Sequence, residues 1–243
     1  LSNNYFSCLK STAELTEILA AIPVTVTSLD LSNSQLYRKS GAALDLAFAA
    51  IPATITTLNL TKNCLGQSEA ELAKILAAIP ATVTTLNLSS NDLGKLTANL
   101  ADALKRIPAT VTTLDLSYNY LSYLKSCAEL VEIVDAIPAT VKTINLSSNN
   151  LYQKSAAELA KIFAAVKAND VISCGCDYDT YTDDELRLIL SALLHHVQIG
   201  KHINRQPFFE RVLLQTVSDH VHSENPMFAW NLLPAEYSAS ENM

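Results

Sequence analysis

The 243-residue chain has few glycines, few cysteines and fewer basic than acidic side chains. Its five glycines are isolated from one another, so the sequence contains no glycine-rich loop that could cradle a phosphate. Its five cysteines lack the spacing of a small disulfide scaffold, which indicates reduced thiols and a final location in a cytosol. The net charge of -7 repels phosphate backbones and anionic membranes, so we expect no nucleic-acid partner.

Long apolar runs are also missing. Prolines and polar residues interrupt every candidate before it reaches the roughly 18 residues that a membrane span needs, so we expect no membrane insertion. Apolar residues nevertheless make up 49% of the chain, which is enough to build the core of a folded protein of this length.

An internal repeat dominates the sequence. The phrase Ile-Pro-(Ala/Val)-Thr returns with periods of 29, 28, 28 and 30 residues. Regular self-similarity at such a period is typical of a solenoid, in which identical units stack on one another. The repeated prolines are Pro23, Pro52, Pro80, Pro108 and Pro138.

After each proline the chain follows the pattern L-x-x-L-x-L-x-x-N-x-L. Apolar residues with a period of two predict a short strand that is buried on one face. In the third repeat the pattern is filled by Val83, Leu86, Leu88, Asn91 and Leu93. We expect the asparagines to be buried, with their amides bonded to the backbone of adjacent repeats, and therefore to be structural. They are Asn63, Asn91, Asn119 and Asn149, with Ser34 in the first complete repeat.

The second half of each repeat predicts a helix. Apolar residues recur there at i, i+3, i+4 and i+7, which gives one buried stripe. A serine followed by a glutamate three residues later predicts a capping box, and Ser40 and Thr97 are expected to cap without the glutamate. We expect each helix to end at the isoleucine before the proline. The predicted boxes are Ser11/Glu14, Ser68/Glu71, Ser126/Glu129 and Ser155/Glu158.

Stacking such units must bend the array. Parallel strands lie about 4.8 Å apart and packed helices roughly 10 Å apart, so the strands take the inner side of the curve. The prediction is an α/β horseshoe with a concave parallel sheet, convex helices and a helical C-terminal cap. Its repeat domain spans residues 1–197, starting in the middle of a repeat, and residues 198–243 form the cap and tail.

We expect the last repeat to be degenerate. Val171, Cys174 and Cys176 are assigned to its three apolar strand positions. Thr182 and Glu185 then predict one more capped helix.

These motifs resemble ribonuclease-inhibitor-type leucine-rich repeats over residues 1–197. The near-verbatim wording Ile-Pro-Ala-Thr-Val-Thr-Thr-Leu-Asn-Leu-Ser and the alanine-rich helices resemble repeats of effectors that intracellular bacterial pathogens deliver into host cells. The resemblance implies a non-enzymatic scaffold that binds a host protein, secreted by a bacterium and cytosolic at its destination, or otherwise cytoplasmic. Residues 198–243 are too few for the ubiquitin-ligase domain that some such effectors carry.

Two alternatives to a binding scaffold stay open. A small hydrolase or transferase could use Cys174 or Cys176 with a C-terminal histidine, although both thiols stand at core leucine positions. A purely structural array is the other. The cysteines and histidines lack the spacing of a zinc site, and the acidic run lacks the glycine and the final glutamate of a calcium loop, so we expect no metal. We also expect no catalytic residue and no cofactor. The five histidines are His195, His196, His202, His220 and His222.

The predicted binding residues lie at the ends of the strands. Outward positions on the concave sheet hold mainly Ser, Thr, Asn and Asp, whereas the energetic centres of protein interfaces are enriched in Tyr, Trp and Arg. Any of the tyrosines could instead cover the last leucine of its repeat. The candidates at the strand ends and in the following loops are Tyr37, Arg38, Lys62, Tyr118, Tyr123, Tyr152 and Tyr178.

Overall fold

A computed structural model describes residues 1–4, 11–96, 100–166 and 171–173, together with residues 182, 184–185, 188–189 and 192. The expected cap at residues 198–243 lies outside the described residues. Thr97, Cys174, Cys176, Tyr178 and the five histidines lie outside them as well.

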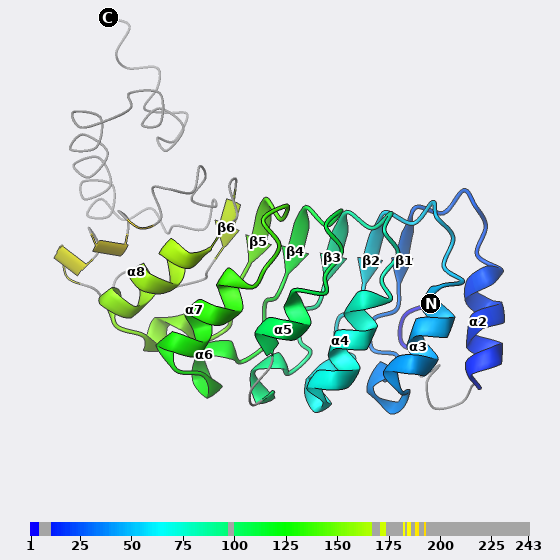
Figure 1. Cartoon of the computed structure of the whole chain (residues 1–243), viewed down its shortest axis with the longest axis horizontal. Helices are drawn as coiled ribbons and strands as arrows, with labels where there is room; N and C mark the ends of the chain where they lie inside the picture. Colours follow the sequence, from blue (N-terminus) through cyan, green and yellow to red (C-terminus); the bar gives the residue numbers. More distant parts are fainter. Residues whose placement is uncertain are drawn as a thin grey trace, which may run out of the picture.

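The strands form one parallel sheet in chain order (Figure 1). Neighbouring strands pair so that equivalent residues of successive repeats lie side by side, for example Leu58 beside Leu86 and Leu86 beside Leu114. The central residue of each of the first five strands is buried, which confirms the predicted period of two. The strands are β1 (Ser28–Asp30), β2 (Thr57–Asn59), β3 (Thr85–Asn87), β4 (Thr113–Asp115), β5 (Thr143–Asn145) and β6 (Val171–Ser173).

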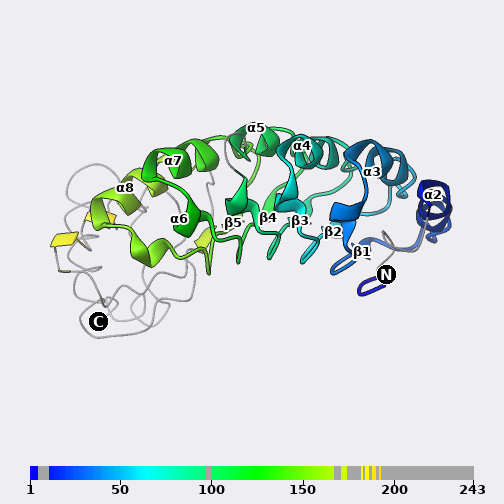
Figure 2. The same cartoon turned by 90° about the horizontal axis from the view of Figure 1, so that it is seen from below.

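Helices form a second layer, on the convex side of the array. Figure 2 shows them along the outer side of a curve and the strands along its inner side, which confirms the horseshoe. They are α2 (Thr12–Ala20), α3 (Gly41–Phe48), α4 (Glu69–Ala77), α5 (Leu100–Leu104), α7 (Cys127–Asp135) and α8 (Ala156–Ala165). Short turns link strand to helix: η1 (Leu36–Arg38), η2 (Leu65–Gln67), η3 (Leu93–Lys95), α6 (Leu121–Leu124) and η4 (Leu151–Gln153).

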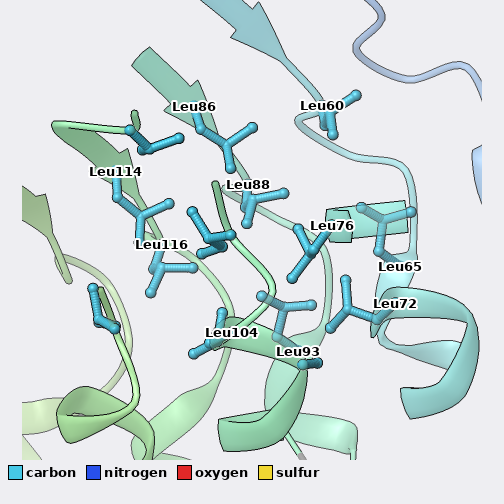
Figure 3. Close-up of a cluster of buried hydrophobic side chains, with 14 of the residues drawn as sticks. Leu60, Leu65, Leu72, Leu76, Leu86, Leu88, Leu93, Leu104, Leu114 and Leu116 are labelled. Carbon is cyan, nitrogen blue, oxygen red and sulfur yellow. The ribbon is translucent and has the colours of Figure 1, made fainter. Parts of the chain in front are cut away.

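The core fills the space between the two layers. Leu86 and Leu88 reach into it from the sheet, Leu72 and Leu76 from a helix, and Leu93 from a linking turn (Figure 3). All five are fully buried. Because each repeat contributes to one shared core, the burial of a side chain depends on the neighbouring repeats as well as its own.

The asparagines form the predicted ladder. Asn91 Oδ1 accepts hydrogen bonds from the backbone N–H of Asn63 (2.8 Å) and Leu65 (3.4 Å), both in the preceding repeat. Its Nδ2 donates to the carbonyls of Leu60 and Leu88, each at 2.9 Å. Asn63, Asn119 and Asn149 repeat this arrangement. Their burial and these bonds confirm the structural role.

Most of the predicted helix starts are confirmed, with one correction. The Ser11, Ser126 and Ser155 boxes have both reciprocal bonds, Ser40 caps α3 alone, and Thr182 exchanges bonds with Glu185. At Ser68 the box is incomplete, because the Glu71 carboxylate accepts instead from the backbone N–H of Gly41 and from Lys74. The missing side chain of Gly41 allows this approach, since a Cβ there would lie 2.9 Å from Glu71 Oε2.

The predicted helix ends are wrong by two or three residues. Helix α4, for example, ends at Ala77, and α5 ends at Leu104. The isoleucine before each proline lies in a tighter closing turn, as Ile107 N–H donates to Leu104 O at 3.0 Å. Such i→i+3 bonds commonly close the last turn and satisfy carbonyls that the helix leaves without partners.

The predicted repeat register is confirmed at the N-terminal end of the array and is wrong at the C-terminal end. The first residues follow the repeat as predicted, because Asn3 N–H donates to Ser32 O at 2.9 Å as Asn33 N–H does to Thr61 O at 2.8 Å. At the other end, Ile172 pairs with Ile144, so the predicted register with Cys174 in that position is wrong by two residues.

The physical reason for this shift lies in the residues that each register places in the strand. The predicted register would place Gly175 at the strand position of Asn145, and glycine weakens a strand interior. The observed register uses the β-branched Val171 and Ile172 instead. A shift of two residues leaves the inward and outward alternation unchanged.

Candidate protein-binding rim

The candidate site is the set of loops that follow the strands, which we call the rim. It comprises residues 32–39, 61–67, 89–96, 117–125 and 147–154, one loop for each of the first five strands. In every loop the two residues that flank the ladder position have positive φ, for example Tyr118 (55°) and Tyr120 (58°) on either side of Asn119. This backbone turns the ladder residue into the core, while all ten flanking residues are exposed or half-buried.

Tyrosines at these left-handed positions are unusual. The left-handed region is favoured by Asn and Asp and is uncommon for bulky side chains. All five loops share this backbone, so the left-handed conformation belongs to the repeat. The fourth loop differs from the others in carrying an aromatic side chain at both positions, and the equivalent residues are Asn33, Gln35, Lys62, Cys64, Ser90, Asp92, Ser148 and Asn150.

Four tyrosines gather on the fourth and fifth loops, and we call them the tyrosine cluster. They are Tyr118, Tyr120, Tyr123 and Tyr152, which are exposed by 59%, 48%, 67% and 52%. Three of them belong to the loop after β4, and Tyr152 lies in η4, which contacts α6. The cluster thus spans two adjacent repeats.

Tyr120 was missed by the sequence interpretation. It stands between the ladder residue Asn119 and the buried Leu121, a position that the L-x-x-L-x-L-x-x-N-x-L pattern leaves unspecified. The sequence signal that could have identified it is the alternation of buried and exposed residues in the loop, since a residue between two buried positions must point outward. Gln35, Cys64, Asp92 and Asn150 occupy the equivalent position.

The orientation of two rim tyrosines is fixed by their neighbours. The Tyr152 hydroxyl accepts from Asn150 Nδ2 (3.2 Å) and Gln153 Nε2 (3.5 Å). The Tyr37 hydroxyl accepts from Arg38 Nε (3.1 Å), and the Arg38 guanidinium lies 5.4 Å from the Tyr37 ring centre. Rings that are already held lose less conformational entropy when a partner binds.

The other predicted residues that the structure describes lie along the same rim, whereas Tyr178 lies outside the described residues. Tyr37 and Arg38 are exposed in the first loop and Lys62 in the second. Four strand spacings, roughly 19 Å at 4.8 Å each, separate the loop of Tyr37 from that of Tyr152. The rim therefore has an aromatic part at the fourth and fifth loops and a separate Tyr37–Arg38 pair at the first.

The alternative reading, that the tyrosines serve to cover the last leucine of each repeat, is not needed to explain leucine burial. Leu65 and Leu93 are exposed by only 3% and 0% although glycines follow them. Leu151, which Tyr152 follows, is exposed by 4%. Since the leucines are equally buried without an adjacent tyrosine, the aromatic rings are available for another role.

Gly66 and Gly94 allow the middle loops to pack closely. A Cβ at Gly66 would lie 2.1 Å from the Asp92 carbonyl oxygen, and one at Gly94 would lie 2.5 Å from that of Tyr120. Real Cβ atoms do not approach so near, so each glycine sets the distance to the next loop. Gly94 in this way supports the backbone that carries the tyrosine cluster.

Polar groups at the concave centre are largely used within the sheet. The Oδ1 atom of the last residue of each of the first five strands accepts from the backbone N–H two residues later, at 2.8–3.0 Å. The hydroxyls of Thr56, Thr84 and Thr112 donate to carbonyls of the preceding strand at 3.3–3.4 Å. The last strand residues are Asp30, Asn59, Asn87, Asp115 and Asn145.

The part of the chain that the structure describes offers neither a metal site nor a membrane span. It holds no group of three or more His, Cys, Asp or Glu side chains that could bind a metal ion. None of its helices has both the length and the apolar character required to span a bilayer.

Comparison with known proteins agrees with the repeat architecture. A family model described as a leucine-rich repeat matches residues 80–95. The leucine-rich repeat-containing protein LegL7 from Legionella pneumophila is 32% identical in sequence, with a TM-score of 0.73, and the match covers 93% of this chain and 82% of that chain. No curated protein matches the chain. The solved relative comes from a bacterial pathogen, in agreement with the resemblance drawn from the repeat wording.

Proposed function

This chain belongs to the leucine-rich-repeat protein family, and from that premise we propose that it is a non-enzymatic scaffold that binds a protein through its rim. The observation that carries the proposal is the tyrosine cluster, four exposed rings on two adjacent loops. Tyrosine buries a large ring at low entropy cost and keeps a polar tip, which makes it a frequent energetic centre of interfaces.

The partner that we propose is a host protein, and the chain itself is a secreted bacterial effector acting in the host cytosol. Two observations support this assignment. The repeat sequence resembles that of effector repeats, and the solved relative comes from Legionella pneumophila. The net charge of -7 also disfavours nucleic acid and anionic membranes as ligands.

A catalytic role has less support than binding. The alternative hydrolase or transferase needs Cys174 or Cys176 with a C-terminal histidine, all of which lie outside the described residues. A purely structural array would not require exposed aromatic rings at positions where the other loops carry Asn, Gln, Lys, Cys, Ser or Asp. Binding accounts for those tyrosines directly.

The test compares two double variants after a partner has been captured from a host-cell lysate and purified. Tyr118→Ala with Tyr152→Ala should weaken binding by about 2 kcal/mol or more, as measured by titration calorimetry. Thr85→Ala with Thr113→Ala, at the concave centre, should change it by less than roughly 1 kcal/mol. Circular dichroism must first show that both variants are folded. A larger loss from the threonine pair would refute the rim as the site.

A further inference from the structure

The rim is basic although the protein is acidic. Its five loops contain six basic side chains and one acidic side chain, Asp92, for a net charge of +5. The six long helices α2, α3, α4, α5, α7 and α8 carry ten acidic and two basic side chains. The basic residues of the rim are Arg38, Lys39, Lys62, Lys95, Lys125 and Lys154. Summed over the five repeats, the rim therefore carries positive charge and the helices carry negative charge, although the third loop by itself is neutral because Lys95 and Asp92 cancel.

Three of these cations are exposed, whereas Lys39 and Lys154 are half-buried and Lys125 is buried. Arg38, Lys62 and Lys95 are exposed on the first, second and third loops. Lys95 also pairs with Asp92 at 2.9 Å, and this hydrogen bond raises the pKa of the lysine. The tyrosine cluster occupies the fourth and fifth loops. Going from β1 to β5, the rim thus changes from a cationic to an aromatic surface.

Two further cations of the rim are bonded to the backbone of the preceding repeat. Lys125 is buried, and its ammonium donates to the Leu96 carbonyl. The Lys154 ammonium donates to the Lys125 carbonyl at 2.9 Å. The Lys125 ammonium also lies 3.5 Å from a Glu129 carboxylate oxygen, which offsets part of its charge. The carbonyl that Lys154 contacts is neutral, so the charge of Lys154 still adds to the positive potential over the rim.

Resting on the proposed function, we propose that the rim binds an acidic segment of its partner protein. Carboxylates of that segment lie over Arg38, Lys62 and Lys95, and its apolar side chains pack on the tyrosine cluster. A basic segment could place ammonium groups on the tyrosine rings, but the positive potential of the rim opposes it.

A nucleic acid is the less suitable anion for this surface. The five loops extend over only about 19 Å at 4.8 Å per strand, and the rest of a longer polyanion would be repelled by a protein whose net charge is -7. A protein segment can restrict its charges to the rim. The acidic segment is therefore the class of ligand that the charge distribution favours.

Poly-L-glutamate of about 50 residues is the probe for an acidic protein segment, and dT20 is the probe for nucleic acid. Binding to the full chain is measured by fluorescence anisotropy of the labelled probes at pH 7 and low ionic strength. We expect poly-L-glutamate to bind more tightly than dT20, with an affinity that falls at least about tenfold between 50 and 200 mM salt because exposed charges are screened.

A matched pair of variants locates the binding surface. Arg38→Glu with Lys62→Glu should lower the affinity for poly-L-glutamate at least about tenfold. Lys74→Glu with Lys161→Glu makes the same change in charge on α4 and α8 and should alter the affinity by less than about twofold, because those positions belong to the other layer. An equal loss in both pairs, no binding of poly-L-glutamate, or tighter binding of dT20 would overturn the proposal.

Failure of this inference is distinguishable from failure of the proposed function. If poly-L-glutamate does not bind while Tyr118→Ala with Tyr152→Ala still releases the captured partner, the rim binds a protein of different charge and the acidic-segment proposal alone is wrong. If the tyrosine pair has no effect on the captured partner, the proposed binding site fails independently of the charge test.

Discussion

The ammonium group of Lys154 donates a hydrogen bond to the backbone carbonyl of Lys125, with 2.9 Å between Nζ and O. Lys125 makes the equivalent bond to the carbonyl of Leu96 one repeat earlier. Both lysines stand directly before the serine that caps the following helix. Successive repeats are therefore tied together at the helix starts as well as through the asparagine ladder.

Replacing Lys125 should destabilise the fold. Lys125→Met keeps most of the buried stem but removes the donor to Leu96 O and the ion pair with Glu129. The loss should be about 1 to 3 kcal/mol, because a buried carbonyl loses its charged partner. Lys74→Met is the control, since it breaks a comparable i,i+3 pair on an exposed surface and should cost less than about 0.5 kcal/mol. Urea midpoints that shift equally would show that burial of Lys125 is unimportant.

The asparagine ladder gives a second stability prediction. Asn91→Leu removes the acceptor for two buried N–H groups, those of Asn63 and Leu65. We expect a loss of about 1 to 3 kcal/mol in the free energy of unfolding, the usual cost of unsatisfied buried groups.

Asn87→Ala is the matched control for the ladder. Asn87 makes one comparable bond, to the backbone of Ser89, but it is only half-buried, so water can replace that bond. Chemical denaturation of both variants decides the matter. An unchanged midpoint for Asn91→Leu would be incompatible with the ladder geometry.

The sequence predicted the ladder, the sheet and the curvature because each depends on a repeated local pattern. The five-fold recurrence of the leucine positions averages out local exceptions, and the helix stripes agree with it. The predicted register of β6 was wrong because this repeat is degenerate and occurs once. Its alternating apolar residues are compatible with two registers that differ by two residues. In a segment that is not repeated, packing against the neighbouring repeat determines the register.

Parts of the site followed from sequence and parts did not. Tyr118, Tyr123 and Tyr152 were identifiable because tyrosines after a strand or in a loop are visible departures from the repeat. Tyr120 and the hydrogen bond from Lys154 to Lys125 were not identifiable, since both depend on where a neighbouring repeat places its backbone. The Ser68 box failed similarly, because Gly41 belongs to the preceding repeat and competes for the Glu71 carboxylate.

The capping boxes make stability depend on pH. The backbone N–H and then the hydroxyl of Ser126 hold the pKa of Glu129 below its usual value, and Ser155 does the same for Glu158. A carboxylate with a lowered pKa in the folded state stabilises the fold above its unfolded pKa of about 4.3. That contribution is lost as the pH falls through the lower, folded pKa.

Glu129→Gln with Glu158→Gln should therefore flatten the stability profile in the acid range. We expect the wild-type urea midpoint to fall more steeply than that of the double variant as the pH is lowered below the unfolded pKa of about 4.3 and the folded carboxylates become protonated. Glu132→Gln, in the middle of α7 and away from the cap, should leave the slope close to wild type. Parallel profiles for wild type and the double variant would contradict the role of the boxes.

The final prediction separates the stability of the rim from its binding function. Gly94→Ala and Gly66→Ala each introduce a Cβ against a backbone carbonyl, of Tyr120 in the first case and of Asp92 in the second. Both must push neighbouring loops apart, so both should lower the melting temperature, by about 4 °C or more if each costs roughly 2 kcal/mol.

Only Gly94→Ala displaces the loop that carries Tyr118, Tyr120 and Tyr123. It should therefore weaken the captured protein partner at least about tenfold, because interface tyrosines act through close packing. Gly66→Ala should leave the affinity within about threefold, since the loop that it moves holds no tyrosine of the cluster. Calorimetric titration at a temperature where both variants are folded supplies the comparison. Equal affinities would mean that the partner does not contact the fourth loop, and the rim assignment would then have to move toward Tyr37 and Arg38.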